Sequence, residues 1–297
     1  MADAPFLIDV RRLDATDTWT DDEPVVNDPV AEAAGQLASD ADAGEFDADD
    51  FPAWYRDRVE DDPEPESTPS NPATAGPSAD GSMGWVDALA AVRTLDHLEF
   101  GAVTVIAGDN GTGKSTLVEA IAIAAGFNPE GGSKHLQFST YDTHSPLAEE
   151  LVLGWKRRPQ WGWFLRAETF YGMATHIAED RWLRPTFPDF HRASHGESFL
   201  ALADSKFRGE GLYFLDEPES ALSIQGQRRF VDIMRRSLAA GSQFIVSTHS
   251  PLLMAFPDAV VIEVDIDEGL RRTTFDDLNS TRAWRGFWHD PRDWFRM

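Results

Sequence analysis

Two segments of this 297-residue chain carry side chains suited to binding phosphates and a metal ion. The first, Gly108-Asp-Asn-Gly-Thr-Gly-Lys-Ser115, combines spaced glycines with a lysine and a hydroxyl. The glycines let backbone N–H groups curl around phosphates, Lys114 reaches the outer phosphates, and the Ser115 hydroxyl ligates Mg²⁺. The second, Leu212-Tyr-Phe-Leu-Asp-Glu-Pro-Glu219, ends an apolar run in two carboxylates. Together they predict a site for ATP and Mg²⁺, in which Asp216 binds the metal shell and Glu217 orients the attacking water.

The residues around these segments have the patterns of the elements that must position them. Ala102-Val-Thr-Val-Ile-Ala107 reads as a buried parallel strand, and Ser115 to Ala125 has helical spacing that stops at Gly126. Strand, glycine loop and helix follow in the order that such a phosphate site requires. The apolar run Leu212-Tyr-Phe-Leu215 predicts a central strand covered on both faces, which delivers its carboxylates to the ligand-binding edge of the sheet.

Two further segments could reach a phosphate. Gln243-Phe-Ile-Val-Ser-Thr-His-Ser-Pro251 reads as another buried strand ending in a histidine, and we expect His249 to act as a neutral hydrogen-bonding switch at a γ-phosphate. The alternative is a purely structural histidine. Ala193-Ser-His-Gly-Glu-Ser198 is a polar turn that opens a helix running from Phe199, and its free N–H groups suit a phosphate. The same turn also fits a simple helix cap.

Charge is distributed unevenly along the chain, whose formal net charge is −25. From Asp14 to Asp80, 20 acidic residues stand against two arginines, a balance of −18 that leaves −7 for the rest. Composition predicts that residues 14–83 form a disordered insert, with Phe51-Pro-Ala-Trp-Tyr55 as its aromatic cluster. Phe6-Leu-Ile-Asp-Val10 before the insert and Leu89 to Phe100 after it predict an interrupted hairpin.

The absence of cysteine excludes disulfides and thiol chemistry. No stretch of 18 apolar residues is present, and the first 17 residues lack the pattern of a signal peptide. We therefore expect a cytoplasmic protein without membrane insertion.

The order of these segments resembles the ATP-binding-cassette (ABC) ATPases. Gly108 to Ser115 corresponds to Walker A, Ser194-His-Gly-Glu197 to the signature, Asp216-Glu-Pro-Glu219 to Walker B, Ser220-Ala-Leu-Ser223 to the D-loop, and Ser247-Thr-His249 to the H-switch. Within that superfamily the chain is similar to the small stand-alone predicted ATPases of the ABC-like AAA group, related to SMC and RecF-type proteins. The resemblance covers residues 1–13 and 84–297. It implies an α/β P-loop NTPase fold with a mainly parallel central sheet, an antiparallel edge sheet and a short helical lid over residues 139–192.

The resemblance also implies roles for individual residues. Two chains would sandwich two ATP molecules as a homodimer, with Ser194 and Gly196 of one chain contacting the γ-phosphate held by Lys114 of the other. Glu217, His249 and Lys114 would be catalytic, and Gln137 would join Ser115 and Asp216 at the metal as a Q-loop residue. No aromatic residue that stacks on adenine was identified upstream of the loop. The expected nucleotide-binding residues are Gly108, Asn110, Gly111, Thr112, Gly113, Lys114, Ser115, Thr116, Ser194 and Gly196.

The function predicted from sequence is Mg²⁺-dependent ATP hydrolysis for an unknown client, with nucleic-acid maintenance or defence as examples. The alternatives are the ATP-binding subunit of an ABC transporter and an ATP-gated signalling module with little turnover. A basic and aromatic cluster comprises Lys156-Arg-Arg158 with Trp155, Trp161 and Trp163. It is compatible with binding of single-stranded nucleic acid or a partner protein. The alternative is that the tryptophans form part of the core and the arginines a solvent-exposed rim around it.

Near the end of the chain, Trp284, Phe287 and Trp288 have helical spacing. We expect this helix to dock its apolar face on the body of the protein.

Overall fold

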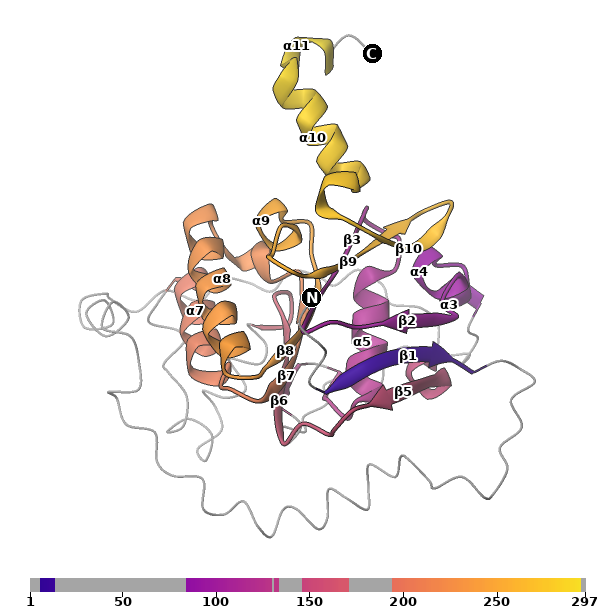
Figure 1. The fold of residues 1–297 in the computed structure, drawn as a ribbon, viewed down its shortest axis with the longest axis vertical. Coiled ribbons are helices and arrows are strands. Elements are labelled where there is room, and N and C mark those ends of the chain that lie inside the picture. Colours follow the sequence, from indigo (N-terminus) through magenta and orange to yellow (C-terminus); the bar gives the residue numbers. More distant parts are fainter. Residues whose placement is uncertain (1–5, 14–83, 130, 134–145, 171–193, 295–297) are drawn as a thin grey trace, which may run out of the picture.

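The computed structural model describes residues 6–13, 84–129, 131–133, 146–170 and 194–294. Within this part the chain forms two sheets with a helix between them (Figure 1). The expected acidic insert at 14–83, Gln137, and residues 139–145 and 171–192 of the expected lid lie outside the described residues.

The larger sheet has seven strands in the described residues, in the order β10-β9-β3-β8-β7-β6-β4. The five strands β9, β3, β8, β7 and β6 run parallel to one another. The edge strands β10 and β4 pair antiparallel with β9 and β6. This confirms the expected mainly parallel sheet. Its strands are β3 (Val103–Gly108), β4 (Gly132–Ser133), β6 (Trp161–Arg166), β7 (Gly211–Asp216), β8 (Gln243–Ser247), β9 (Val260–Asp265) and β10 (Gly269–Thr273).

The smaller sheet is antiparallel, in the order β2-β1-β5, and it confirms the expected edge sheet and hairpin. Its strands are β1 (Leu7–Arg12), β2 (His97–Glu99) and β5 (Leu151–Trp155). The fully buried side chain of Gln243 joins the two sheets. Its Oε1 accepts from the backbone N–H groups of Phe6 and Leu7, and its Nε2 donates to the carbonyls of Leu7 and Gly101.

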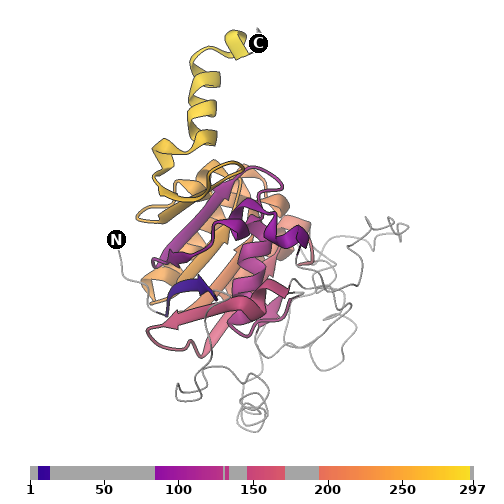
Figure 2. The same ribbon diagram turned by 90° about the vertical axis from the view of Figure 1, so that its right-hand side faces the viewer.

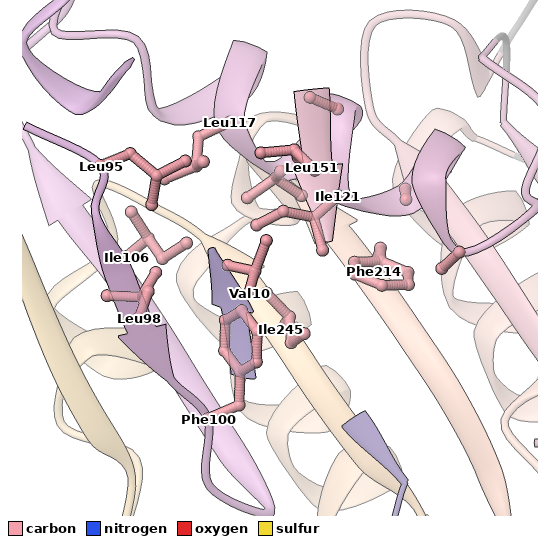
Figure 3. Packing of buried hydrophobic residues seen from close by; sticks show 14 of the residues in the cluster. Val10, Leu95, Leu98, Phe100, Ile106, Leu117, Ile121, Leu151, Phe214 and Ile245 are labelled. Carbon is pink, nitrogen blue, oxygen red and sulfur yellow. The ribbon is translucent and has the colours of Figure 1, made fainter. Parts of the chain in front are cut away.

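Helix α5 (Lys114–Ala124) lies between the sheets (Figures 1 and 2). It packs its buried side chains, such as Leu117 and Ile121, against Val10 of β1 and Phe214 of β7 (Figure 3). A second core on the opposite face of the larger sheet is covered by α7 (His195–Lys206) and α8 (Ile224–Ala239). The shorter elements are α3 (Gly84–Asp87), α4 (Ala90–Arg93), η2 (Pro146–Glu150), η5 (Pro218–Ala221), α9 (Pro251–Met254), η6 (Phe275–Asp277) and α11 (Pro291–Trp294).

The prediction of a helical lid over residues 139–192 is wrong for the residues of this range that the structure describes. Residues 151–155 and 161–166 are β5 and β6, one strand in each sheet. Trp163, Phe164 and Leu165 are at most 1% exposed because β6 is covered on both faces. Continuous burial of this kind is typical of an interior parallel strand.

The C-terminal helix α10 (Asn279–His289) does not lie flat on the body as expected. Figures 1 and 2 show it and α11 extending away from the sheets. Its first turns reach the body, where Thr281 is buried and Trp284 packs against the second core. Trp288, farther along, is 77% exposed, so the apolar face predicted from the spacing is covered only at its base.

Candidate functional site

The glycine loop has the predicted strand-loop-helix setting. The buried strand β3 ends at Gly108 and α5 begins at Lys114. Gly113 has φ +95°, and a Cβ added there would lie 2.9 Å from the Cβ of Leu89. A residue with a side chain would therefore be strained and would clash, which explains the glycine before the helix.

Lys114 folds back over the loop in this structure. Its Nζ donates to the carbonyl of Asp109 at 2.7 Å, and the residue is 3% exposed. Burial lowers the pKa of the Lys114 ammonium, while the carboxylates of Glu217, Asp216, Asp109 and Glu219 act in the opposite direction. Phosphate oxygens would give this buried cation a stronger partner than one carbonyl.

A hollow of about 160 Å³ lies beside the loop. The predicted residues Asn110, Gly111, Gly113, Lys114, Ser115, Thr116 and Glu217 line it, together with Trp85 and Leu89. Trp85 is an aromatic side chain that sequence reasoning missed. It belongs to the four-residue helix α3, and nothing local showed that this helix folds against the loop.

Trp85 and α3 are held in place by an ion-pair network. The guanidinium of Arg12 contacts the carboxylates of Asp87 and Glu150 at 2.5 and 2.7 Å. The pKa of Arg12 is raised: burial is the largest single effect and acts to lower it, but the hydrogen bonds and the charges of Asp87 and Glu150 together outweigh burial. Arg12 therefore braces the wall of the hollow from β1.

Asp216 and Glu217 follow the buried strand β7, as predicted. Asp216 is 6% exposed, and its Oδ1 accepts a hydrogen bond from the Ser247 hydroxyl on the neighbouring strand. Glu217 has φ +47°, a left-handed conformation that costs an ordinary residue about 1 kcal/mol or more. This turn sends its side chain into the hollow beside Lys114.

His249 meets Glu217 at the same edge of the sheet. Its Nε2 lies 3.4 Å from Oε1 of Glu217, is shielded from solvent, and has no hydrogen-bond partner within the described residues. A ring nitrogen in this position is available to an incoming oxygen atom.

Glu219 fixes the loop that carries His249, a link that the sequence did not reveal. Its Oε1 accepts hydrogen bonds from the backbone N–H groups of both His249 and Ser250. Because Glu219 lies in η5, two residues after Glu217, it couples the two loops of the site.

Ser194 and Gly196 lie apart from the hollow, since neither lines it. Ser194 caps α7, and its hydroxyl and backbone N–H both donate hydrogen bonds to the carboxylate of Glu197. A Cβ on Gly196 would lie 2.8 Å from the carbonyl of Ala221 in η5, so only glycine lets this helix start approach so closely.

The residues brought together here fit a magnesium nucleotide. Mg²⁺ prefers hard oxygen ligands, commonly one or two carboxylates with substrate phosphates and water. The Asp216 carboxylate and the Ser115 hydroxyl supply such oxygens next to a buried lysine. Gln137, the third expected ligand, lies outside the described residues.

The tryptophans of β5 and β6 do not form an open stacking surface. Trp163 is 1% exposed, and the guanidinium of Arg158 lies 4.5 Å from the ring centre of Trp155. Arg208 covers Trp161 in the same way at 5.8 Å. The expectation of an aromatic core under an arginine rim describes this region better than a nucleic-acid platform.

Comparisons with known proteins bear on the family of the chain. Residues 189–255 match a family described as "AAA domain, putative AbiEii toxin, Type IV TA system", and residues 92–149 match one described as "AAA domain". The cytochrome c biogenesis ATP-binding export protein CcmA of Rhodopseudomonas palustris (strain HaA2) is 30% identical over 176 residues, which cover 54% of this chain and 86% of that protein. The chain belongs to the ABC-type P-loop ATPases. Proteins of this family bind and hydrolyse ATP with Mg²⁺.

Two further similarities have lower sequence identity. The CcmA protein of Nitrobacter winogradskyi is 27% identical over 172 residues, covering 53% of this ATPase chain and 82% of that protein. Among solved structures, the SMC head domain from Thermotoga maritima is 18% identical with a TM-score of 0.36, covering 60% of this chain and 92% of that one. In the part of the chain that the structure describes, no helix is both long and apolar enough to cross a membrane.

Proposed function

We propose that this chain is an Mg²⁺-dependent ATPase that hydrolyses ATP as a sandwich homodimer. The observation that carries the proposal is the meeting of Lys114, Asp216, Glu217 and His249 at one edge of the sheet, while Ser194 and Gly196 lie outside the hollow. One chain thus offers most of a phosphoryl-transfer site, and a second chain can supply the remainder.

Each residue has a role that follows from its position. Lys114 moves from the Asp109 carbonyl to the outer phosphates, and the loop N–H groups hold the phosphate chain. Glu217 orients and polarises the attacking water, while a ring N–H of His249 donates a hydrogen bond to a γ-phosphate oxygen. When bound, Mg²⁺ neutralises charge on the β- and γ-phosphates. Asp216 and Ser115 would hold that ion.

The second chain would complete the charge neutralisation. The first turn of α7 carries the positive end of the helix dipole, which suits a γ-phosphate. Phosphoryl transfer depends mainly on positioning and charge, so the missing donors should limit turnover by a single chain.

The test is Mg²⁺-ATP turnover measured against protein concentration, with light scattering to report mass. We expect the rate per chain to rise with concentration, and Glu217→Gln to accumulate an ATP-bound dimer with little turnover. Lys114→Ala should show neither ATP binding nor dimer. Concentration-independent turnover by a monomer would refute the two-chain site.

An ATP-binding subunit of a transporter is the second candidate, favoured by the export proteins among the relatives. It predicts that the chain copurifies with a membrane permease that stimulates its turnover. A stand-alone ATPase predicts full turnover without any membrane fraction. The ATP-gated signalling alternative predicts a parent turnover as low as that of Glu217→Gln.

A further inference from the structure

Arg166 occupies a position beside the proposed metal ligand that the mechanism above does not use. It ends β6, and the parallel pairing of β6 with β7 sets it directly opposite Asp216. Its side chain is 17% exposed, against 7% for Asp216 and 15% for Glu119 of α5. The buried carboxylate of Asp216 and two partly buried charged side chains therefore lie together at the edge of the sheet where the metal would bind.

The two carboxylate oxygens of Asp216 have different neighbours. Oδ1 accepts from the Ser247 hydroxyl, whereas Oδ2 lies 3.4 Å from Nε of Arg166. The other end of the guanidinium is anchored, because Nη1 donates to Oε2 of Glu119 at 2.8 Å. Nε itself has no hydrogen-bond partner in the described residues. The guanidinium thus faces the one oxygen of Asp216 that the neighbouring strand leaves open to a ligand.

The charge of Arg166 is permanent, since arginine does not lose its proton in proteins. A free divalent cation approaching Oδ2 would meet this positive charge at close range. A nucleotide that arrives with its metal adds negative phosphate oxygens, which offset the repulsion and offer Nε an acceptor.

We propose that Arg166 is a positioning residue that competes with the metal for Asp216, so that Mg²⁺ enters with the nucleotide and not before it. The inference rests on the proposed role of Asp216 as a metal ligand. Arg166 lies next to Asp216 at the end of the neighbouring strand. Its guanidinium is positively charged and therefore cannot itself be a metal ligand.

The test uses Mn²⁺ alone, titrated into the full chain without nucleotide at physiological salt, with free Mn²⁺ measured by electron paramagnetic resonance. We expect Arg166→Gln to bind Mn²⁺ about tenfold more tightly than the parent, because one unit charge is removed within a few ångströms of the site. Arg166→Lys keeps the charge and should stay within about twofold of the parent. Unchanged or weaker binding by Arg166→Gln would overturn the proposal.

Two controls separate this effect from general changes in the protein. Arg271→Gln breaks another pair of an arginine with a buried carboxylate, that of Glu263, and should leave Mn²⁺ binding unaltered. Arg166→Met puts an unbranched apolar side chain where the guanidinium lies 5.8 Å from the Phe164 ring centre, and it replaces the glutamine variant if that one does not fold. It should show the same gain in Mn²⁺ affinity.

Asp216→Asn distinguishes failure of this inference from failure of the proposed function. Combined with Arg166→Gln, it should abolish the gained Mn²⁺ binding, and retention of that binding would refute the inference. Alone, it should abolish Mg²⁺-ATP turnover. If turnover survives Asp216→Asn, the proposed function fails; if it is lost while Arg166→Gln leaves Mn²⁺ affinity unchanged, only the inference fails.

Discussion

Trp85 provides the most specific prediction about how the nucleotide is held. It lines the same hollow as Lys114 and is 47% exposed, so part of its ring is open to a ligand. Stacking of a base on an aromatic side chain contributes about 1–3 kcal/mol. Since part of the ring already packs on protein, we expect the lower half of that range, about 1–2 kcal/mol, which corresponds to a roughly 5- to 30-fold weaker Kd for ATP in Trp85→Ala.

The assay is calorimetric titration of ATP and of inorganic triphosphate, which lacks the base, into chains that also carry Glu217→Gln to prevent turnover. Trp85→Ala should weaken ATP binding and leave triphosphate binding unchanged, while Trp85→Phe should retain most of the ATP affinity. Trp288→Ala removes a tryptophan that is 77% exposed on α10 and serves as the matched control. Equal losses for ATP and triphosphate, or no loss for ATP, would refute the assignment.

Three further predictions concern the loops and a buried lysine. Glu219→Ala removes the acceptor that holds the loop of His249. In steady-state and binding assays it should lower kcat about tenfold or more and change the Kd for ATP less than about threefold. An unchanged kcat would show that Glu219 does not position the histidine. Gly113→Ala places a Cβ 2.9 Å from the Cβ of Leu89. It should lower the free energy of unfolding in urea by about 1–3 kcal/mol and abolish ATP binding. The control is Gly286→Ala, where a Cβ meets no atom within 4 Å, and it should leave stability unchanged or raise it. Burial lowers the pKa of Lys206 from 10.5 to about 8, so the unfolded chain binds more protons between these values and this residue makes stability rise with pH there. Lys206→Met should therefore raise the free energy of unfolding at pH 7 by up to about 3 kcal/mol and flatten its dependence between pH 8 and 10.5; a wild-type pH profile in this variant would contradict the assignment.

The elements around the glycine loop could be predicted because their signals are local. A buried strand, glycines with positive φ and a helix start lie within about twenty residues around Lys114, and the structure has each where the sequence indicates. The carboxylates of β7 and the histidine after β8 follow the same rule, since parallel strands bring their carboxyl ends to one edge.

The side chains that were missed depend on contacts between distant segments. Trp85 reaches the loop only because α3 packs beside it, and Glu219 matters only because η5 meets the loop after β8. Arg166 faces Asp216 because β6 joins the sheet next to β7, a neighbour that its own sequence does not specify.

The C-terminal helix illustrates a related limit. The spacing of Trp284 and Trp288 shows that one face is apolar, but periodicity does not say what covers that face. In the structure only its base is covered.

The two-chain site is tested most directly by mixing two inactive variants. Lys114→Ala removes the phosphate lysine but keeps a normal signature, and Ser194→Asp keeps a good helix cap while placing a negative charge where the γ-phosphate of the other chain would lie. Each variant alone should be inactive. An equimolar mixture should recover part of the parent turnover, because each mixed dimer has one intact site. No recovery from variants that still fold and form mixed dimers would contradict a site shared between two chains.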